Sequence, residues 1–315
     1  MPSTRTTLFD LPQPSPLRFR TCYHGDARNL RELSSVTKPT SSVALGDRSV
    51  DLVVTSPPYW RKRDYGVEKQ IGQEATAEDY VRCLTTALVE WKRVLRPSGS
   101  NFLNIGDTYH KKSLAGIPCL VETAARELGL RVRNRIVWVK SGGYPDPVRD
   151  RLAARHEYVL YLAVNGYYYD LFGYAAEYSP ERRGANPGDV WQQIPRERDL
   201  GSHLAPFPSE IARRAILLAC PAHVCTGCGE PRRRRVERTT RELDPTRPQA
   251  RRALELARKH NLTDEHIAAI QATGISDAGK ARSVQTGTNK NTARVRELAR
   301  HAKKVLGGVT VHGPG

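Results

Sequence analysis

The sequence has little of what membrane-spanning or disulfide-linked proteins need. No apolar run approaches the ~20 residues that a membrane-spanning helix requires, and residues 1–20 lack the apolar core of a signal peptide. Six cysteines in 315 residues are too few for a disulfide scaffold. We therefore expect a soluble protein of a reducing, cytoplasmic compartment.

Acidic residues are also scarce, since 33 Asp and Glu stand against 50 Lys and Arg, for a formal net charge of +17. The excess is uneven: residues 231–315 carry 19 basic and 8 acidic side chains, whereas residues 1–230 carry 31 and 25. A basic excess gathered in one segment suggests a polyanionic partner, most simply nucleic acid. The alternative is a solvated basic tail.

Apolar runs alternate with helical stripes between the two ends of the chain. The alternation predicts an α/β fold with a Rossmann-like, doubly wound sheet, in which ligands bind beyond the carboxyl ends of the strands. A helix is expected from Thr76, which with Asp79 fits a capping box, to a stop at Pro97 and Gly99. Further helices are expected at 117–129 and 208–220, and strands at 49–54, 101–109, 133–140 and 156–164.

We expect three regions: a flexible arm at 1–20, a core at 21–230, and a basic helical appendage at 231–315. Helices are predicted in the appendage around "NLTDEHI" and near residue 300. The final "GGVTVHGPG" is interpreted as a tail without periodicity.

The stretch "SVDLVVTSPPYW" ends a β-branched run in a rigid elbow of Ser56, Pro57, Pro58 and Tyr59. The two prolines have restricted φ and donate no backbone N–H, so their carbonyls can face outward as acceptors. With the Ser56 hydroxyl and the flat face of Tyr59, they would accept hydrogen bonds from an amino group and stack on a ring. Such a pocket suits an exocyclic amine of a nucleobase, pulling its nitrogen towards tetrahedral geometry for attack on a methyl group.

The elbow and other motifs make residues 21–230 resemble the amino-methylating DNA methyltransferases in which the catalytic motif precedes the cofactor motif. "TSPPY" is the form typical of the N4-cytosine enzymes, whereas adenine-N6 enzymes more often have Asp at the Ser56 position. The other similar segments, in order, are "HGDARNL" (24–30), "LNIGDTY" (103–109), "IVWVKSGGYPDP" (136–147), "RHEYVLYL" (155–162), "NPGDVW" (186–191) and "HLAPFPSEIARRAI" (203–216).

The resemblance implies methyl transfer from S-adenosyl-L-methionine to the N4 atom of a cytosine flipped out of double-stranded DNA, which yields N4-methylcytosine. Ser56 to Tyr59 would grip that base. A bacterial, nucleoid-associated enzyme, alone or with a cognate restriction endonuclease in a restriction-modification system, is the implied setting. Cofactor contacts are implied for four residues: Asp26, His203, Pro206 and Phe207.

One family element, a D-P-F-x-G-x-G turn that completes the cofactor site, is not found between Pro221 and Gly315. A truncated product or one half of a split enzyme is therefore one interpretation. Two alternatives to the N4-cytosine enzyme stay open: an adenine-N6 methyltransferase, and an inactive or truncated DNA-binding fragment. A C5-cytosine enzyme would need a Pro-Cys nucleophile, but Pro118-Cys119 opens a helix, so Cys119 is interpreted as packing.

Of three further sites, two have two interpretations each and the third has one. Cys225 and Cys228 have zinc-knuckle spacing, with Cys220 and His223 nearby, or they form a tight turn with free thiols. Asp107 either lines the pocket or caps a turn. The run Arg232, Arg233, Arg234 and Arg235 would contact DNA phosphates without reading sequence.

Overall fold

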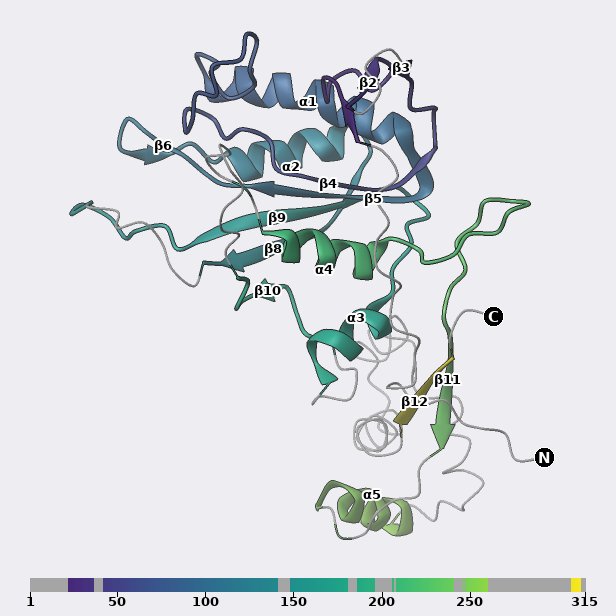
Figure 1. The fold of residues 1–315 in the computed structure, drawn as a ribbon. Helices are drawn as coiled ribbons and strands as arrows, with labels where there is room; N and C mark the ends of the chain where they lie inside the picture. Colours follow the sequence, from purple (N-terminus) through teal and green to yellow (C-terminus); the bar gives the residue numbers. More distant parts are fainter. Residues whose placement is uncertain are drawn as a thin grey trace. The chain divides into compact units, whose positions relative to one another are not determined.

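The computed structural model describes residues 22–36, 42–140, 148–180, 186–195, 206, 208–240, 246, 248–259 and 307–312 (Figure 1). The chain divides into two compact units, one within residues 14–233 and one that includes residues 234–315. The arm expected at 1–20 lies outside the described residues.

A five-stranded mixed sheet forms the centre of the first unit. β4 and β5 are parallel, as are β8 and β10, whereas β9 runs antiparallel to both of its neighbours, β5 and β8. The α/β prediction is confirmed, and each of the four predicted strands is present. In sheet order the strands are β10 (Val190–Trp191), β8 (Arg131–Val139), β9 (His156–Ala163), β5 (Leu95–Ile105) and β4 (Val50–Thr55).

Helices cover both faces of this sheet (Figure 1). α1 (Ala77–Val94) and α2 (Ile117–Glu127) pack on one face, where their apolar side chains join one buried cluster with Leu103 and Ile105 of β5. α4 (Ser209–Ala219) covers the other face and shares a second cluster with α3 (Leu171–Tyr178) and the aromatic side chains of the sheet. This is the three-layer arrangement expected of a doubly wound fold.

The start of α1 is as predicted, but its end is not. The Thr76 hydroxyl accepts the N–H of Asp79 at 3.1 Å and so caps the helix. The helix ends at Val94, because Leu95 is already extended and begins β5. Pro97 and Gly99, predicted to stop the helix, lie instead inside that strand.

Short strands outside the central sheet were missed by the sequence analysis. β1 (Tyr23–His24), β2 (Leu33–Ser35) and β3 (Ser42–Val43) form one small antiparallel sheet. β6 (Tyr109–His110) and β7 (Ser113–Leu114) form another. Strands of two or three residues are too short to leave an alternation in the sequence, so only their pairing defines them.

In the second unit, β11 (Arg235–Thr240) pairs antiparallel with β12 (Gly307–His312), and α5 (Pro248–Lys259) is helical. Interpreting residues 307–315 as a tail is therefore wrong for 307–312. The pairing partner of β12 lies about 70 residues earlier, and no local pattern reveals it. The helices predicted between 260 and 306 fall outside the described residues. Among the helices that are described, none is long and apolar enough to cross a membrane.

Candidate active site

Four strands bring polar side chains to one edge of the central sheet. Ser56 directly follows β4, and Asn104 lies near the end of the parallel strand β5. Glu157 lies near the start of the antiparallel strand β9, and Lys140 directly follows β8, whose Trp138 pairs with Glu157. Parallel neighbours end at the same edge, and an antiparallel strand begins there. The sheet topology alone therefore places these four residues together.

The Ser56–Tyr59 elbow is anchored from α1. The Tyr80 hydroxyl, on a fully buried side chain, donates to the Pro58 carbonyl at 3.1 Å. The expectation that both proline carbonyls face outward without a donor is therefore wrong for Pro58. Pro57 is buried, whereas Ser56 and Pro58 are half-buried. The elbow is a rigid, partly accessible turn.

The ring of Tyr59 is held at both ends. Its hydroxyl donates to Oε2 of Glu157 at 2.7 Å and accepts from Nδ2 of Asn104 at 2.9 Å. A Cβ added at Gly106 would lie 2.8 Å from Cε2 of Tyr59, so a glycine is needed where the ring crosses the end of β5. Burial, followed by the negative charge of Glu157, raises the pKa of the Tyr59 hydroxyl well above its ordinary value. Tyr59 therefore stays protonated and acts as a donor.

Asn104 and Glu157 were not among the site residues expected from the sequence. Asn104 is 2% exposed, and its Nδ2 also lies 3.2 Å from Oε2 of Glu157 and 3.4 Å from Oγ of Ser56. The other Glu157 oxygen forms an ion pair with Lys140. The signal that could have found both residues is a polar side chain inside an otherwise apolar strand, in "FLNI" and in "HEYVLYL".

Asp107 caps the start of α2. Its carboxylate accepts the N–H groups of Gly116 and Ile117, each at 3.1 Å, and that of Thr108 at 2.8 Å. Gly116, at the N-cap position, has φ +73° and no side chain, so the cap comes from a residue ten positions before the helix. The capping interpretation of Asp107 is confirmed.

Asp107→Ala is expected to lower the free energy of unfolding by about 1–2 kcal/mol, since an N-cap removal costs about that much. Urea denaturation followed by circular dichroism would measure the loss. Asp64→Ala is the matched control, because the Asp64 carboxylate accepts one backbone N–H, from Gly66, in an exposed loop. An equal loss in the two variants would contradict the capping role.

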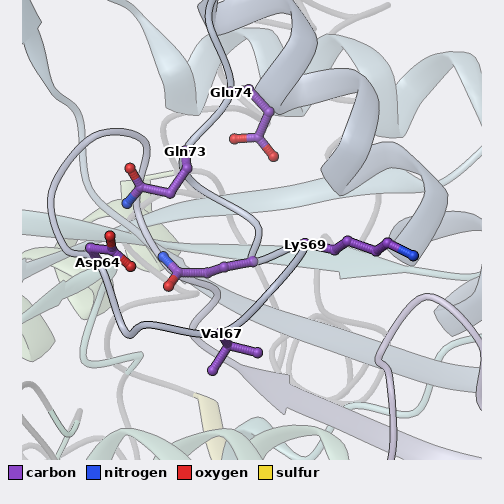
Figure 2. A pocket seen from close by; sticks show the side chains of 6 residues that line it. Asp64, Val67, Lys69, Gln73 and Glu74 are labelled. Carbon is purple, nitrogen blue, oxygen red and sulfur yellow. The ribbon is translucent and has the colours of Figure 1, made fainter.

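The loop between the elbow and α1 forms an open hollow, a surface pocket of about 370 Å³ (Figure 2). It is lined by Asp64, Val67, Lys69, Gln70, Gln73 and Glu74. Two of its polar side chains form hydrogen bonds within the loop itself. The Gln70 amide donates to the Arg63 carbonyl and accepts from the N–H of Tyr65, and the Gln73 amide also donates to Arg63. None of the four elbow residues lines this hollow, so it is separate from the elbow.

The structure describes only two of the four residues implied for the cofactor, Asp26 and Pro206. Asp26 is half-exposed and pairs with Arg28 at 2.7 Å, and hydrogen bonds from Arg28 lower the pKa of its carboxyl group. Pro206 lies just before α4, while His203 and Phe207 lie outside the described residues. Cofactor contact by these four residues stays a prediction.

The "CTGC" segment forms a tight turn. The N–H of Gly229 donates to the Cys225 carbonyl, and the N–H of Cys225 donates to Glu230, both at 2.9 Å. Backbone N–H groups of Cys228 and Gly227 lower the pKa of the Cys225 thiol. Both cysteines are free, and within the part of the chain that the structure describes no three His, Cys, Asp or Glu side chains are placed to hold a metal ion. The donor set does not fit the zinc site considered from the sequence.

The arginine run does not form one uniform cluster. Arg232 is exposed, and its backbone N–H donates to the His223 carbonyl. The Arg233 guanidinium donates to the carbonyls of Gly166 and Tyr167 at 3.2 and 3.3 Å, which fastens this segment to the core. Arg234 and Arg235 belong to the second unit. Phosphate contact by these four residues stays a prediction.

The interpretation of Cys119 as a packing residue is wrong, because Cys119 is exposed on α2, where its Sγ accepts from the Arg135 guanidinium at 3.5 Å.

Comparisons of the sequence with family models and with known proteins both identify methyltransferases. Residues 50–223 match the family model described as DNA methylase. The type II methyltransferase M.XycI of Xanthomonas campestris pv. cyanopsidis is 34% identical over 238 residues, which cover 65% of this chain and 74% of that protein. The type II methyltransferase M.Cfr9I of Citrobacter freundii is 32% identical over 235 residues, with the same coverage of 65% and 74%.

Among solved structures, the PvuII DNA methyltransferase (cytosine-N4-specific) matches with a TM-score of 0.45 and 20% identity. The match covers 55% of this chain and 64% of that structure, which is less than two thirds of its length.

Proposed function

Because this chain belongs to the DNA methylase family, we propose that it methylates the exocyclic N4 atom of cytosine in double-stranded DNA. S-adenosyl-L-methionine supplies the methyl group in this proposal. The observation that carries it is the elbow: Ser56 to Tyr59 follow β4 at the edge where the ends of three strands and the start of β9 converge.

The elbow suits direct transfer to an amine. The lone pair of an exocyclic amino nitrogen is delocalised into its ring, so the amine is a poor nucleophile until the nitrogen becomes tetrahedral. Hydrogen bonds from its two N–H groups to Ser56 Oγ and the Pro57 carbonyl favour that geometry and orient the lone pair. The nitrogen would form the N–CH₃ bond as the S–CH₃ bond of the donor breaks, with that electron pair left on sulfur as a neutral thioether, and the methylated nitrogen would then release one proton to solvent. The transfer is direct and needs no covalent bond between the base and the protein.

Tyr59 supplies the stacking face. Its hydroxyl is fixed by Glu157 and Asn104, so the ring cannot rotate freely when a flipped base arrives. A ring already held in place loses less conformational entropy on binding. Flipping itself costs a few kcal/mol, and stacking on an aromatic face offsets part of that cost.

Cytosine is favoured over adenine by Ser56. A serine hydroxyl stands where the adenine-N6 enzymes more often carry aspartate, and the hydroxyl is neutral. Adenine-N6 transfer is the second candidate, because the same elbow would accept the amino group of that base. DNA is the proposed partner through the basic residues of 231–315, and a restriction endonuclease is the proposed functional partner in a bacterial cytoplasm.

The test is transfer of radiolabelled methyl groups from S-adenosyl-L-methionine to unmethylated plasmid DNA, followed by digestion to nucleosides. The expected result is label in N4-methylcytosine. Label in N6-methyladenine would keep the elbow mechanism and overturn the base assignment. Absence of label with DNA still bound would contradict the proposal for this 315-residue chain and favour a DNA-binding protein.

A further inference from the structure

We propose that Asn104 is a further substrate-binding residue, whose Oδ1 atom accepts a hydrogen bond from the amino group that enters the elbow. This inference rests on the proposed function, because it deepens the assignment of the same site. The Pro58 carbonyl is not a free acceptor, because it already accepts from the Tyr80 hydroxyl. That leaves Ser56 Oγ and the Pro57 carbonyl as the elbow's acceptors, and Asn104 Oδ1 would share one of the two N–H groups with them in a bifurcated hydrogen bond.

One end of the Asn104 amide, Nδ2, is hydrogen-bonded, and the other end, Oδ1, has no donor among the described residues. Its Nδ2 lies 2.9 Å from the Tyr59 hydroxyl, 3.2 Å from the Glu157 carboxylate and 3.4 Å from the Ser56 hydroxyl. Its Oδ1 is buried, and no donor among the described residues reaches it. One side chain therefore contacts both Ser56 and Tyr59 while presenting an unused acceptor.

Glu157 fixes which way this amide points. An ionised carboxylate accepts hydrogen bonds and donates none. A flipped amide would place Oδ1 against Oε2 of Glu157, where two acceptors would repel each other. The other oxygen of Glu157 forms an ion pair with Lys140, so the carboxylate is held between Lys140 and the Asn104 amide. Glu157 is thus a positioning residue that acts through Asn104 and Tyr59.

A buried acceptor without a donor costs about 1–3 kcal/mol, and such groups are rare in folded proteins. Asn101, on the same strand, also has buried amide atoms without a hydrogen-bond partner, at both ends of its amide. What distinguishes Asn104 is its contact with the elbow. Since Oδ1 is sealed from water, the hydrogen bond forms only when the incoming base displaces the atoms that cover it.

The test compares Asn104→Ala with Asn101→Ala, a matched change three residues earlier on β5 in an equally buried, unpaired asparagine. Single-turnover methyl transfer to unmethylated plasmid DNA is expected to fall about 100-fold for N104A, in line with the loss of one preorganised hydrogen bond at a reaction centre. The KM for S-adenosyl-L-methionine should stay near the wild-type value. N101A should transfer at about the wild-type rate.

Tyr59→Phe distinguishes the role of the Asn104 Nδ2 atom from that of its Oδ1 atom. It removes the hydroxyl that Nδ2 contacts and leaves Oδ1 in place. Its rate is expected to fall less than that of N104A. Equal losses in Y59F and N104A would mean that Asn104 acts only by holding Tyr59, and would overturn the proposal.

A second readout does not need catalysis. The wild-type chain should bind a 12-nucleotide oligo(dC) more tightly than oligo(dT), because thymine has a carbonyl where cytosine has the amine. N104A should lose most of that preference, while N101A should keep it. If the wild type transfers no methyl group, the proposed function fails. The ratio of the affinities for oligo(dC) and oligo(dT) still decides the role of Asn104. An unchanged ratio in N104A, or wild-type transfer by N104A, would refute the assignment.

Discussion

Ser56→Ala is expected to reduce the rate of methyl transfer at least ~100-fold, the magnitude typical of removing one hydrogen bond at a reaction centre, while DNA affinity changes little. The hydroxyl lies at the carboxyl end of β4, 3.4 Å from Nδ2 of Asn104, and in the proposed function it accepts from the reacting amine and does not contact the DNA backbone. Its loss removes an acceptor needed in the transition state, so kcat should fall while the KM for DNA stays near the wild-type value. Single-turnover transfer and equilibrium DNA binding measure the two effects separately.

Ser49→Ala is the matched control, because Ser49 lies beside the opposite end of β4 and its hydroxyl donates to the Gly46 carbonyl. That variant should keep wild-type transfer. If Ser56→Ala lost DNA affinity and methyl transfer to the same degree, the hydroxyl would serve to bind DNA, and the assignment to the amine would be wrong.

Trp60→Ala is expected to lower the free energy of unfolding by about 3–5 kcal/mol, as other buried aromatic truncations do. Trp60 is 2% exposed and directly follows the elbow. Its Nε1 donates to the Glu74 carbonyl at 2.9 Å, and its own carbonyl accepts from the Thr108 hydroxyl at 2.9 Å. The indole therefore joins the elbow to the loop before α1 while packing in the cluster beneath α1 and α2.

Urea denaturation would measure this loss, and Trp60→Phe is the graded control. Phenylalanine keeps most of the apolar volume but leaves the Glu74 carbonyl without its donor, so it should be destabilised less than the alanine variant. Equal stability of Trp60→Ala and the wild type would show that the indole contributes little to the core. A loss of activity in Trp60→Ala without a loss of stability would instead give this residue a role in the reaction.

Most of the core architecture could be predicted from local patterns. The run 49–54 becomes β4, the Thr76 cap starts α1, and Gly129, with φ +75°, follows the end of α2 as expected. These elements are long enough to show a period of 2 or 3.6, and their caps use side chains a few residues away. The pairing of β11 with β12 escaped prediction because its two strands lie about 70 residues apart.

The sequence by itself determined that the chain carries the rigid acceptor elbow, and where along the chain that elbow lies. Two prolines restrict the backbone whatever surrounds them. Only the tertiary structure decided which side chains meet the elbow. Asn104 and Glu157 lie 45 and 98 residues from Tyr59, and the antiparallel insertion of β9 beside β5 brings them to its hydroxyl. Hydrogen bonds depend on distances in space, and a sequence specifies those distances only once the order of strands in the sheet is known.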